Sequence, residues 1–371
     1  MKKVIVLFLC FSLITSIFTG CATPGSTTGG KIDVGIVLPT KDESRWLADE
    51  AKFREIIKEK GYKAEIMYSQ ANSAVEKTNI ESLIEKGIKV LVLCAFDATA
   101  AASAVEKAKA EGITIISYDR LIMDTSAVDY YVTFDSVAVG RAMGQYLVDQ
   151  AKGKGNNLYL YSGALTDNNS FLFFQGQWEA LQPKIADGTF IVRNSDKAQS
   201  YANIKDLTRE QMSEIMSQVD TEWSMETSKT LAEAHLTANP PENKNVCYVL
   251  GPDDDTCRAL SDTFRADADV KELIITGADG VAASIQYLID GKQSMTVFKD
   301  PTMLVKDTMN LVDTILSGKK PEVNAQYNNN VIDVPSIQSD VVVVTRDNLK
   351  KVFFDTGYYD KNNYTGWENL K

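Results

Sequence analysis

From residue 31 onward the chain alternates short apolar runs with longer amphipathic stretches. The continuous apolar run Val90–Leu93 is typical of a parallel strand that is buried on both faces. Stretches 43–60 and 74–86 carry apolar residues at helical spacing, and each ends at a glycine, as helices often do. Strand and helix alternate in this way as far as Ile116. The pattern predicts βαβ units, and therefore a parallel sheet with right-handed crossovers.

The same alternation starts again after Asp135 and continues to about residue 275. The predicted helices are 137–150, 171–182, 226–237 and 256–266, and the predicted strands are 158–161, 190–192, 246–250 and 273–275. Segment 196–222 fits this pattern poorly, and we expect it to be an elaborated loop with a short helix at 208–216. The predicted fold class is therefore α/β, with two Rossmann-like lobes that each contain a parallel sheet.

The first thirty residues have the pattern of an export leader and a tether. Two lysines precede the apolar run 4–14, which is shorter than the ~20 residues of a membrane-spanning helix. Residues 1–20 are therefore predicted to be a signal peptide. The ending Gly20-Cys21 resembles the bacterial lipobox, which implies that Cys21 is lipidated and that 21–30 is a flexible tether. The alternative is an ordinary cleaved signal that leaves Cys21 free.

Composition removes several classes of function. The 371 residues carry a net charge of -11, which argues against binding to nucleic acid and favours a soluble monomer. The single histidine, His235, excludes a His-His metal pair, and we expect it to pack in a helix. None of the five cysteines forms a C-x-x-C pair, and Cys94 and Cys247 are predicted to be buried free thiols. The alternative for Cys247 is a disulfide with Cys257, which would need an oxidising compartment. No catalytic residue, metal or cofactor is predicted.

Charged and amide side chains follow the ends of the predicted strands. Ligands of open parallel sheets bind beyond these carboxyl ends, so these tips are the candidate site. The candidate residues at or near the tips are Arg45, Trp46, Asp119, Arg120, Asn168, Asn169, Trp223, Asp253, Asp254, Asp279 and Lys299. Some have other interpretations: Asp119 and Arg120 would also suit a surface ion pair, and 253–255 would suit a solvated helix N-terminus.

Taken together, the order and spacing of these tips resemble the periplasmic sugar-binding proteins of the ribose/xylose/galactose group. The likeness is greatest to the xylose-binding and multiple-monosaccharide receptors, and it covers residue 32 to Tyr359. The matching stretches are 44–46, 117–120, 133–135, 166–169, 277–279, 295–299, 329–331 and 334–336.

The resemblance implies a role for each candidate. Arg45, Arg120 and Lys299 would donate hydrogen bonds to the sugar, Asp119 and Asp279 would accept them, Asn168 or Asn169 would do both, and Trp46 and Trp223 would cover the faces of the ring. Ala278 stands where relatives often have Gln. Asp253 or Asp254 replaces an Asn of some relatives. We expect these two departures to affect the choice of sugar.

The resemblance also implies the organisation and the function of the chain. It places three crossovers near Asp135, Lys299 and Asn330, so that 31–136 and 299–329 form one lobe while 137–298 and 330–371 form the other. A monosaccharide like xylose, glucose or galactose would be captured by hinge closure. The protein would be held outside the cytoplasm, in the periplasm or at the cell surface, by lipidated Cys21. It would deliver the sugar to an ABC permease and its ATPase.

Three other functions are alternatives to this one. A sugar receptor for chemotaxis or sensor-kinase signalling would have the same binding lobes. A regulator of the lactose-repressor type would begin with a basic helix-turn-helix, whereas this chain begins with a leader and is acidic. An exported carbohydrate-active enzyme would need a pair of carboxylates at catalytic spacing, which the sequence does not identify.

Overall fold

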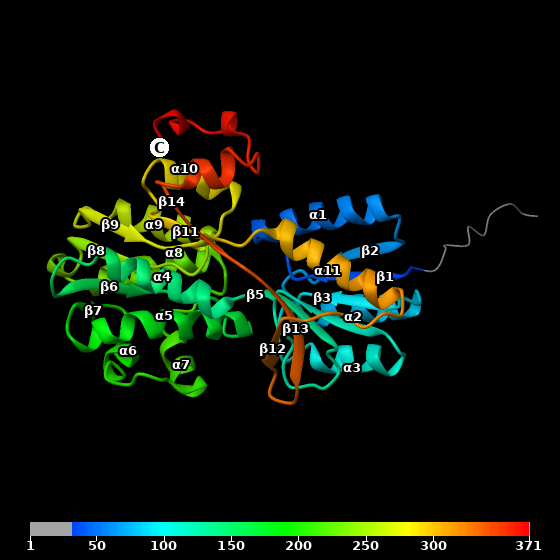
Figure 1. The fold of residues 1–371 in the computed structure, drawn as a ribbon. Helices are drawn as coiled ribbons and strands as arrows, with labels where there is room; N and C mark the ends of the chain where they lie inside the picture. The colour runs from blue at the N-terminus through cyan, green and yellow to red at the C-terminus, as the bar shows by residue number, and fades with distance from the viewer. Residues whose placement is uncertain (1–31, 371) are drawn as a thin grey trace, which may run out of the picture. The chain divides into compact units, whose positions relative to one another are not determined.

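The computed structural model describes residues 32–370, whose helices and strands are labelled in Figure 1. The predicted signal peptide, Cys21 and the tether 21–30 lie outside the described residues. None of the helices between residues 32 and 370 has the length and apolar content needed to cross a membrane.

The first lobe is built on a seven-stranded sheet with the strand order β12-β13-β5-β4-β3-β1-β2. All neighbouring strands in it are parallel except β12, which pairs antiparallel to β13. The strands are β1 (Val34–Leu38), β2 (Ala64–Tyr68), β3 (Val90–Leu93), β4 (Thr114–Tyr118), β5 (Tyr130–Phe134), β12 (Ala325–Asn328) and β13 (Asp333–Ser339), and the helices are α1 (Ser44–Lys60), α2 (Ser73–Glu85), α3 (Ala102–Ala110) and α11 (Pro301–Leu316).

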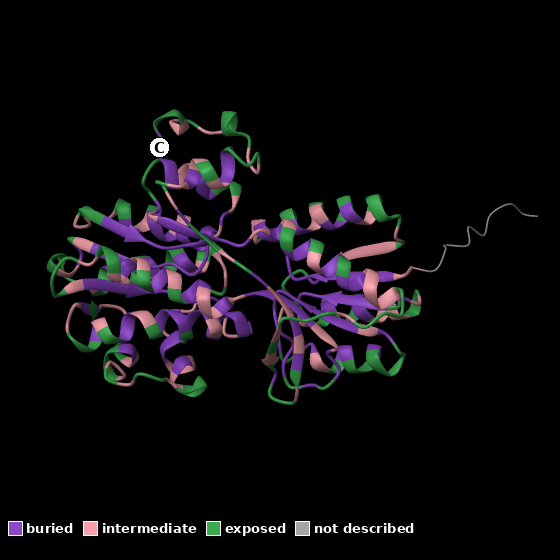
Figure 2. Cartoon of the chain, in the orientation of Figure 1, coloured by how far each residue is buried: buried purple, intermediate pink, exposed green. Residues whose placement is uncertain are grey.

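Helices cover both faces of this sheet, which explains the continuous apolar strands. Side chains alternate along β3, so Val90 and Val92 pack toward α1 and α11 while Leu91 and Leu93 pack toward α2 and α3. The purple of β3 and its neighbours in Figure 2 shows the same burial. The parallel order places the carboxyl ends of β1, β3 and β4 at one edge.

The second lobe contains two smaller sheets, with the orders β7-β6-β8-β9 and β10-β11-β14. The first is fully parallel, and β14 pairs antiparallel to β11. The strands are β6 (Asn156–Leu160), β7 (Phe190–Val192), β8 (Val246–Leu250), β9 (Glu272–Ile275), β10 (Ala278–Asp279), β11 (Met295–Phe298) and β14 (Val342–Thr345). The helices are α4 (Ser136–Gln150), α5 (Asn168–Ala186), α6 (Asp196–Ser200), α7 (Arg209–Met216), α8 (Met225–Ala238), α9 (Asp254–Ala266) and α10 (Ala282–Ile289).

The poorly patterned segment 196–222 holds the short helices α6 and α7, of which α7 lies where a helix was predicted. Cys94, Cys247 and Cys257 are buried free thiols. His235 is half-buried in α8, where its Nδ1 lies 3.1 Å from the Tyr161 hydroxyl, in agreement with a packing role.

The chain passes between the lobes three times. It leaves the first sheet after Phe134, returns after Phe298, and leaves it again between Ser339 and Val342. The third crossing was expected near Asn330, and this expectation is wrong. Asn330 lies in the turn of the β12–β13 hairpin, so residues 330–339 belong to the first lobe because β13 pairs with β5.

Two glycines bring α4 and α5 into close contact. A Cβ built at Gly140 would lie 1.9 Å from the Phe173 carbonyl oxygen, and one at Gly176 would lie 2.0 Å from the Val137 carbonyl oxygen. Only glycine fits at such an approach of two backbones. This packing fixes the first turn of α5, and with it Asn169, beside the first crossing.

An aromatic segment follows β14. It includes a short π-helical turn, Lys350–Phe354, and packs around Phe298 at the end of β11. The Phe353 and Tyr358 rings lie 4.8 and 4.9 Å from the Phe298 ring. The Tyr359 hydroxyl donates to the Gly280 carbonyl oxygen at 2.8 Å. The segment therefore braces the neighbours of Lys299 and Asp279.

Candidate ligand site

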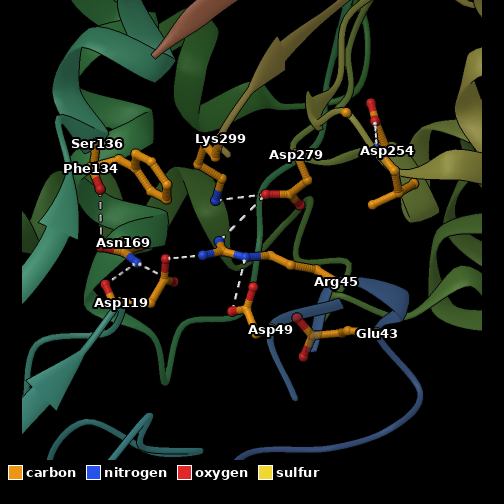
Figure 3. A network of polar contacts seen from close by, with 12 residues as sticks. Glu43, Arg45, Asp49, Asp119, Phe134, Ser136, Asn169, Asp254, Asp279 and Lys299 are labelled. Carbon is orange, nitrogen blue, oxygen red and sulfur yellow. Dashed lines mark hydrogen bonds and ion pairs between the residues drawn. The ribbon is translucent and has the colours of Figure 1, made fainter. Parts of the chain in front are cut away.

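Strand ends from both lobes meet around one small cavity of about 20 Å³ (Figure 3). Nine of the predicted site residues line it: Arg45, Trp46, Asp119, Arg120, Asn169, Trp223, Asp253, Asp279 and Lys299. A cavity of this size has room for about one water, far less than a sugar ring needs. A sugar therefore enters only when the lobes separate.

Arg45 lies at the centre of the site and joins the two lobes (Figure 3). It stands in the first turn of α1, where its Nη2 lies 2.5 Å from Asp119 Oδ2. Its Nη1 lies 3.5 Å from Asp279 Oδ1 in the second lobe, and its Nε lies 3.8 Å from Asp49 Oδ2. One guanidinium thus holds three carboxylates, of which Asp49 is four residues further along the same helix.

Asp119 and Asp279 both have a backbone conformation that non-glycine residues rarely adopt. Their φ angles are 59° and 95°. Left-handed backbone at such residues costs about 1–2 kcal/mol and is concentrated at functional sites. Surrounding contacts hold the Asp119 backbone in place, because its carbonyl oxygen accepts from Tyr131 Oη at 2.7 Å and from Asn169 Nδ2 at 2.8 Å. The structure thereby aims both carboxylates into the cavity.

Arg120 makes a second polar link between the lobes. Its Nη2 donates to Glu43 at 3.0 Å, and its Nε lies 3.0 Å from Asp167 Oδ2, at the N-terminus of α5. Lys299 acts similarly at the second crossing: its Nζ lies 2.8 Å from Asp279 Oδ1. The cavity is therefore ringed by cations and carboxylates in alternation.

Burial and charge shift the carboxyl groups of the site in opposite directions. Burial alone would raise the pKa of Asp119, but the charges of Arg45, Lys299 and Arg120 outweigh it and lower that pKa. Burial raises the pKa of Asp49 to about 7. Burial and the neighbouring carboxylates of Asp255 and Asp279 raise the pKa of Asp253. The site therefore offers both charged acceptors and carboxyls that hold a proton readily.

The two predicted tryptophans occupy different environments. Trp46 is buried in the first lobe, and the Arg45 and Arg120 guanidinium carbons lie 4.7 and 5.2 Å from its ring centre. Trp223 is in the second lobe, with its ring 6.3 Å from the ring of Phe173 in an edge-on arrangement. The first lobe therefore contributes Trp46 to the cavity lining, and the second lobe contributes the aromatic pair Phe173 and Trp223.

Two predicted site residues lie outside the cavity lining. Asn168 Oδ1 accepts from Arg209 Nη1 at 2.9 Å. Asp254 accepts from Gln293 Nε2 at 2.6 Å and from the Val281 backbone N–H at 3.0 Å, which supports the loop that carries Asp279. From the sequence, either Asn168 or Asn169 and either Asp253 or Asp254 could contact the ligand. In the structure, Asn169 and Asp253 line the cavity.

Sequence reasoning missed four residues: Glu43, Asp49, Asp167 and Phe173. Each has a signal in the sequence. Glu43 and Asp167 belong to tips already recognised as candidates, while Asp49 and Phe173 stand four residues after Arg45 and Asn169, which is the helical spacing that puts side chains on one face.

Known proteins share this fold and this order of elements. The model of the periplasmic binding protein domain matches residues 34–320. The multiple sugar-binding periplasmic receptor ChvE of Rhizobium radiobacter is 32% identical, with 88% of this chain and 90% of that protein covered. The D-xylose-binding periplasmic protein of Escherichia coli is 26% identical, with 97% and 98% covered.

A solved structure is more similar still. The carbohydrate transporter solute binding protein of Chloroflexus aurantiacus, in complex with D-glucose, is 55% identical and superposes with a TM-score of 0.89, over 92% of this chain and 99% of that one. The chain therefore belongs to the periplasmic binding protein family. The predicted resemblance and the predicted fold class are confirmed. The family comprises extracytoplasmic solute-binding proteins rather than enzymes.

Proposed function

We propose that this protein captures a monosaccharide in the cavity between its lobes and delivers it to an ABC-type importer. The observation that carries this proposal is the convergence of Arg45, Asp119, Arg120, Asp279 and Lys299 from both lobes on one buried point. A monosaccharide is a ring of hydroxyls with apolar faces, so it needs donors and acceptors in alternation. Each buried hydroxyl without a partner costs roughly 1–3 kcal/mol.

Hydroxyl groups of the sugar would replace contacts that the side chains now make with each other. When the lobes separate at the three crossings, the Arg45–Asp279 and Arg120–Asp167 pairs open, because each spans both lobes. When the lobes close on a bound sugar, its hydroxyl groups can donate to the carboxylates and accept from the arginines of these pairs. The aromatic rings of Trp46, Phe173 and Trp223, which line the cavity, would meet its apolar faces.

The similarity to the glucose complex of the Chloroflexus protein supports a glucose-like ligand over a pentose such as xylose. The transporter association follows the same family pattern, with a permease and its ATPase as partners. The Gly20-Cys21 motif supports lipidation of Cys21 as the membrane anchor. Cys21→Ser would abolish incorporation of labelled fatty acid, and unchanged labelling would refute the anchor.

A thermal-shift screen with glucose, galactose, xylose, arabinose and ribose tests the ligand. A sugar at about 100 times its Kd should stabilise the protein by about 2.7 kcal/mol. Arg120→Ala and Lys299→Met should abolish the shift, with circular dichroism to verify the fold. Arg54→Ala, an exposed arginine on α1, should keep it. If none of these sugars stabilises the wild-type protein, the proposed ligand class is wrong.

A further inference from the structure

A larger cavity adjoins the candidate site at the mouth between the lobes. Its volume is about 590 Å³, which lies within the range of roughly 300–1,000 Å³ that is typical of small-molecule sites. Loops of the first lobe provide Thr40 and Phe96, and loops of the second lobe provide Ala164 and Ser224. Like the candidate site, this mouth cavity is therefore formed by both lobes.

The two cavities share part of their walls. Glu43, Arg120 and Trp223 line both of them. Glu43 and Arg120 belong to the first lobe and Trp223 belongs to the second, so separation of the lobes opens a passage between the cavities. A ligand in the candidate site therefore has a direct route along which a substituent extends into the mouth cavity.

The shared wall is built with unusual backbone at Trp223. Glu222 and Trp223 have φ angles of 54° and 57°, a backbone conformation that residues other than glycine rarely adopt. Gly163 accepts the indole, because a Cβ at this position would lie 2.0 Å from the Trp223 ring. Thr221 fixes the segment through its N–H, which donates to the Ser162 carbonyl oxygen at 3.0 Å. These contacts hold an aromatic ring at the boundary between the cavities.

The lining of the mouth cavity defines the chemistry of its occupant. Its charged groups are the five carboxylates of Asp42, Glu43, Asp220, Glu222 and Glu226 and one guanidinium, Arg120, which is already paired with carboxylates on either side. Three hydroxyl side chains, two aromatic rings and four apolar side chains complete the lining. Such a surface repels anionic groups, whereas an uncharged polyhydroxylated ring finds acceptors for its hydroxyls and faces on which to stack.

We infer that the mouth cavity is a second subsite for an uncharged sugar ring, so that the protein also binds neutral disaccharides whose first ring occupies the candidate site. This inference rests on the proposed function, because it needs a sugar in the candidate site. It extends the ligand class from monosaccharides to short neutral glycosides, and it excludes extensions that carry a carboxylate or a phosphate.

Isothermal titration of the wild-type protein provides the first test. The titrants are glucose, maltose, cellobiose and lactose, together with glucose 6-phosphate as the anionic comparison. At least one neutral disaccharide should bind, and saturating glucose should abolish its binding heat because the two ligands share the candidate site. The subsite is refuted if glucose binds while none of the disaccharides does, or if glucose 6-phosphate binds as well as glucose.

A cavity-filling variant provides the second test. Ala164 lines the mouth cavity but not the candidate site, so Ala164→Trp should lower the disaccharide affinity by about tenfold or more while the glucose affinity changes by less than about twofold. Ala110→Trp, at an exposed position on α3, is the matched control and should change neither. Equal losses for both ligands in Ala164→Trp would refute a separate subsite. Absence of binding by every sugar would instead refute the proposed function itself.

Discussion

Substitution of Arg45 by methionine tests the electrostatic design of the site. Methionine keeps most of the apolar stem and removes the charge that faces Asp49, Asp119 and Asp279. Removing one partner of a buried ion pair typically costs about 3–5 kcal/mol, because the remaining charge is buried without compensation. We therefore expect Arg45→Met to lower the free energy of unfolding by about 3–5 kcal/mol at pH 7.5.

The loss should depend on pH with a definite sign. In the wild type the pKa of Asp119 is lowered, so its contribution is fully present above the unfolded value of about 3.9 and is lost only as the pH falls below it. In Arg45→Met the burial of Asp119 is no longer offset by this charge, and its pKa should rise. The variant then gains protons between pH 7.5 and 5, and the difference in stability from the wild type should shrink.

Urea unfolding at pH 7.5 and at pH 5 measures both quantities. Arg54→Met is the matched control, since Arg54 stands on the same helix and its side chain is 62% exposed where it pairs with Glu50. Exposed pairs contribute roughly 0–1 kcal/mol, so the control should change little at either pH. A loss below about 1 kcal/mol at pH 7.5, or an equal loss at both values, would refute the reasoning.

Three further predictions concern stability and positioning. Burial raises the pKa of Glu76 to about 7, so the folded state holds a proton that the unfolded state releases, and stability rises as the pH falls from 8 toward 5. Glu76→Gln should therefore raise the free energy of unfolding at pH 8 by roughly 1–3 kcal/mol, measured by urea unfolding, and should flatten that rise. An unchanged pH profile of stability would contradict this. Gly176→Ala should lower stability by more than about 2 kcal/mol because its Cβ would overlap the Val137 carbonyl, and a neutral result in thermal melts would disprove the tight contact of α4 and α5. Tyr359→Phe should weaken sugar binding about fivefold by calorimetry, because one hydrogen bond of about 1 kcal/mol to Gly280 is lost. The control Tyr364→Phe loses a longer contact of 3.3 Å to Ala282 and should have a smaller effect. Equal affinities for the wild type and Tyr359→Phe would show that sugar binding does not require this hydrogen bond.

Apolar periodicity predicted most of the fold, because strands buried on both faces and helices buried on one leave different patterns. It did not predict a strand at β13. Residues 333–339 contain Pro335 and have neither a continuous apolar run nor a regular alternation of polar and apolar positions, although the segment pairs with β5 inside the sheet. The preceding Asn329 and Asn330 do mark a turn, but it is the turn of a hairpin and not a crossover.

The strand-end rule found the region of the site but did not resolve neighbouring residues. Asn168 and Asn169 stand in one helical turn, where successive side chains point in different directions, and the contact of Asn168 with Arg209 comes from the segment that the pattern left undefined. Asp254 is turned away from the cavity by its contacts with Gln293 and with the Val281 backbone N–H, and no periodic signal marks either residue as its partner. Such orientations depend on tertiary packing, which the spacing of residues along one element does not contain.

The aromatic segment after β14 has a consequence for the order in which the site forms during synthesis. It follows every strand of both lobes along the chain, so the ribosome makes it after all of them. Until Phe353 and Tyr359 are made, the end of β11 and the loop at Gly280 lack the contacts that these two residues supply. A nascent chain that stops after β14 is therefore expected to contain all its strands and yet to bind sugar weakly.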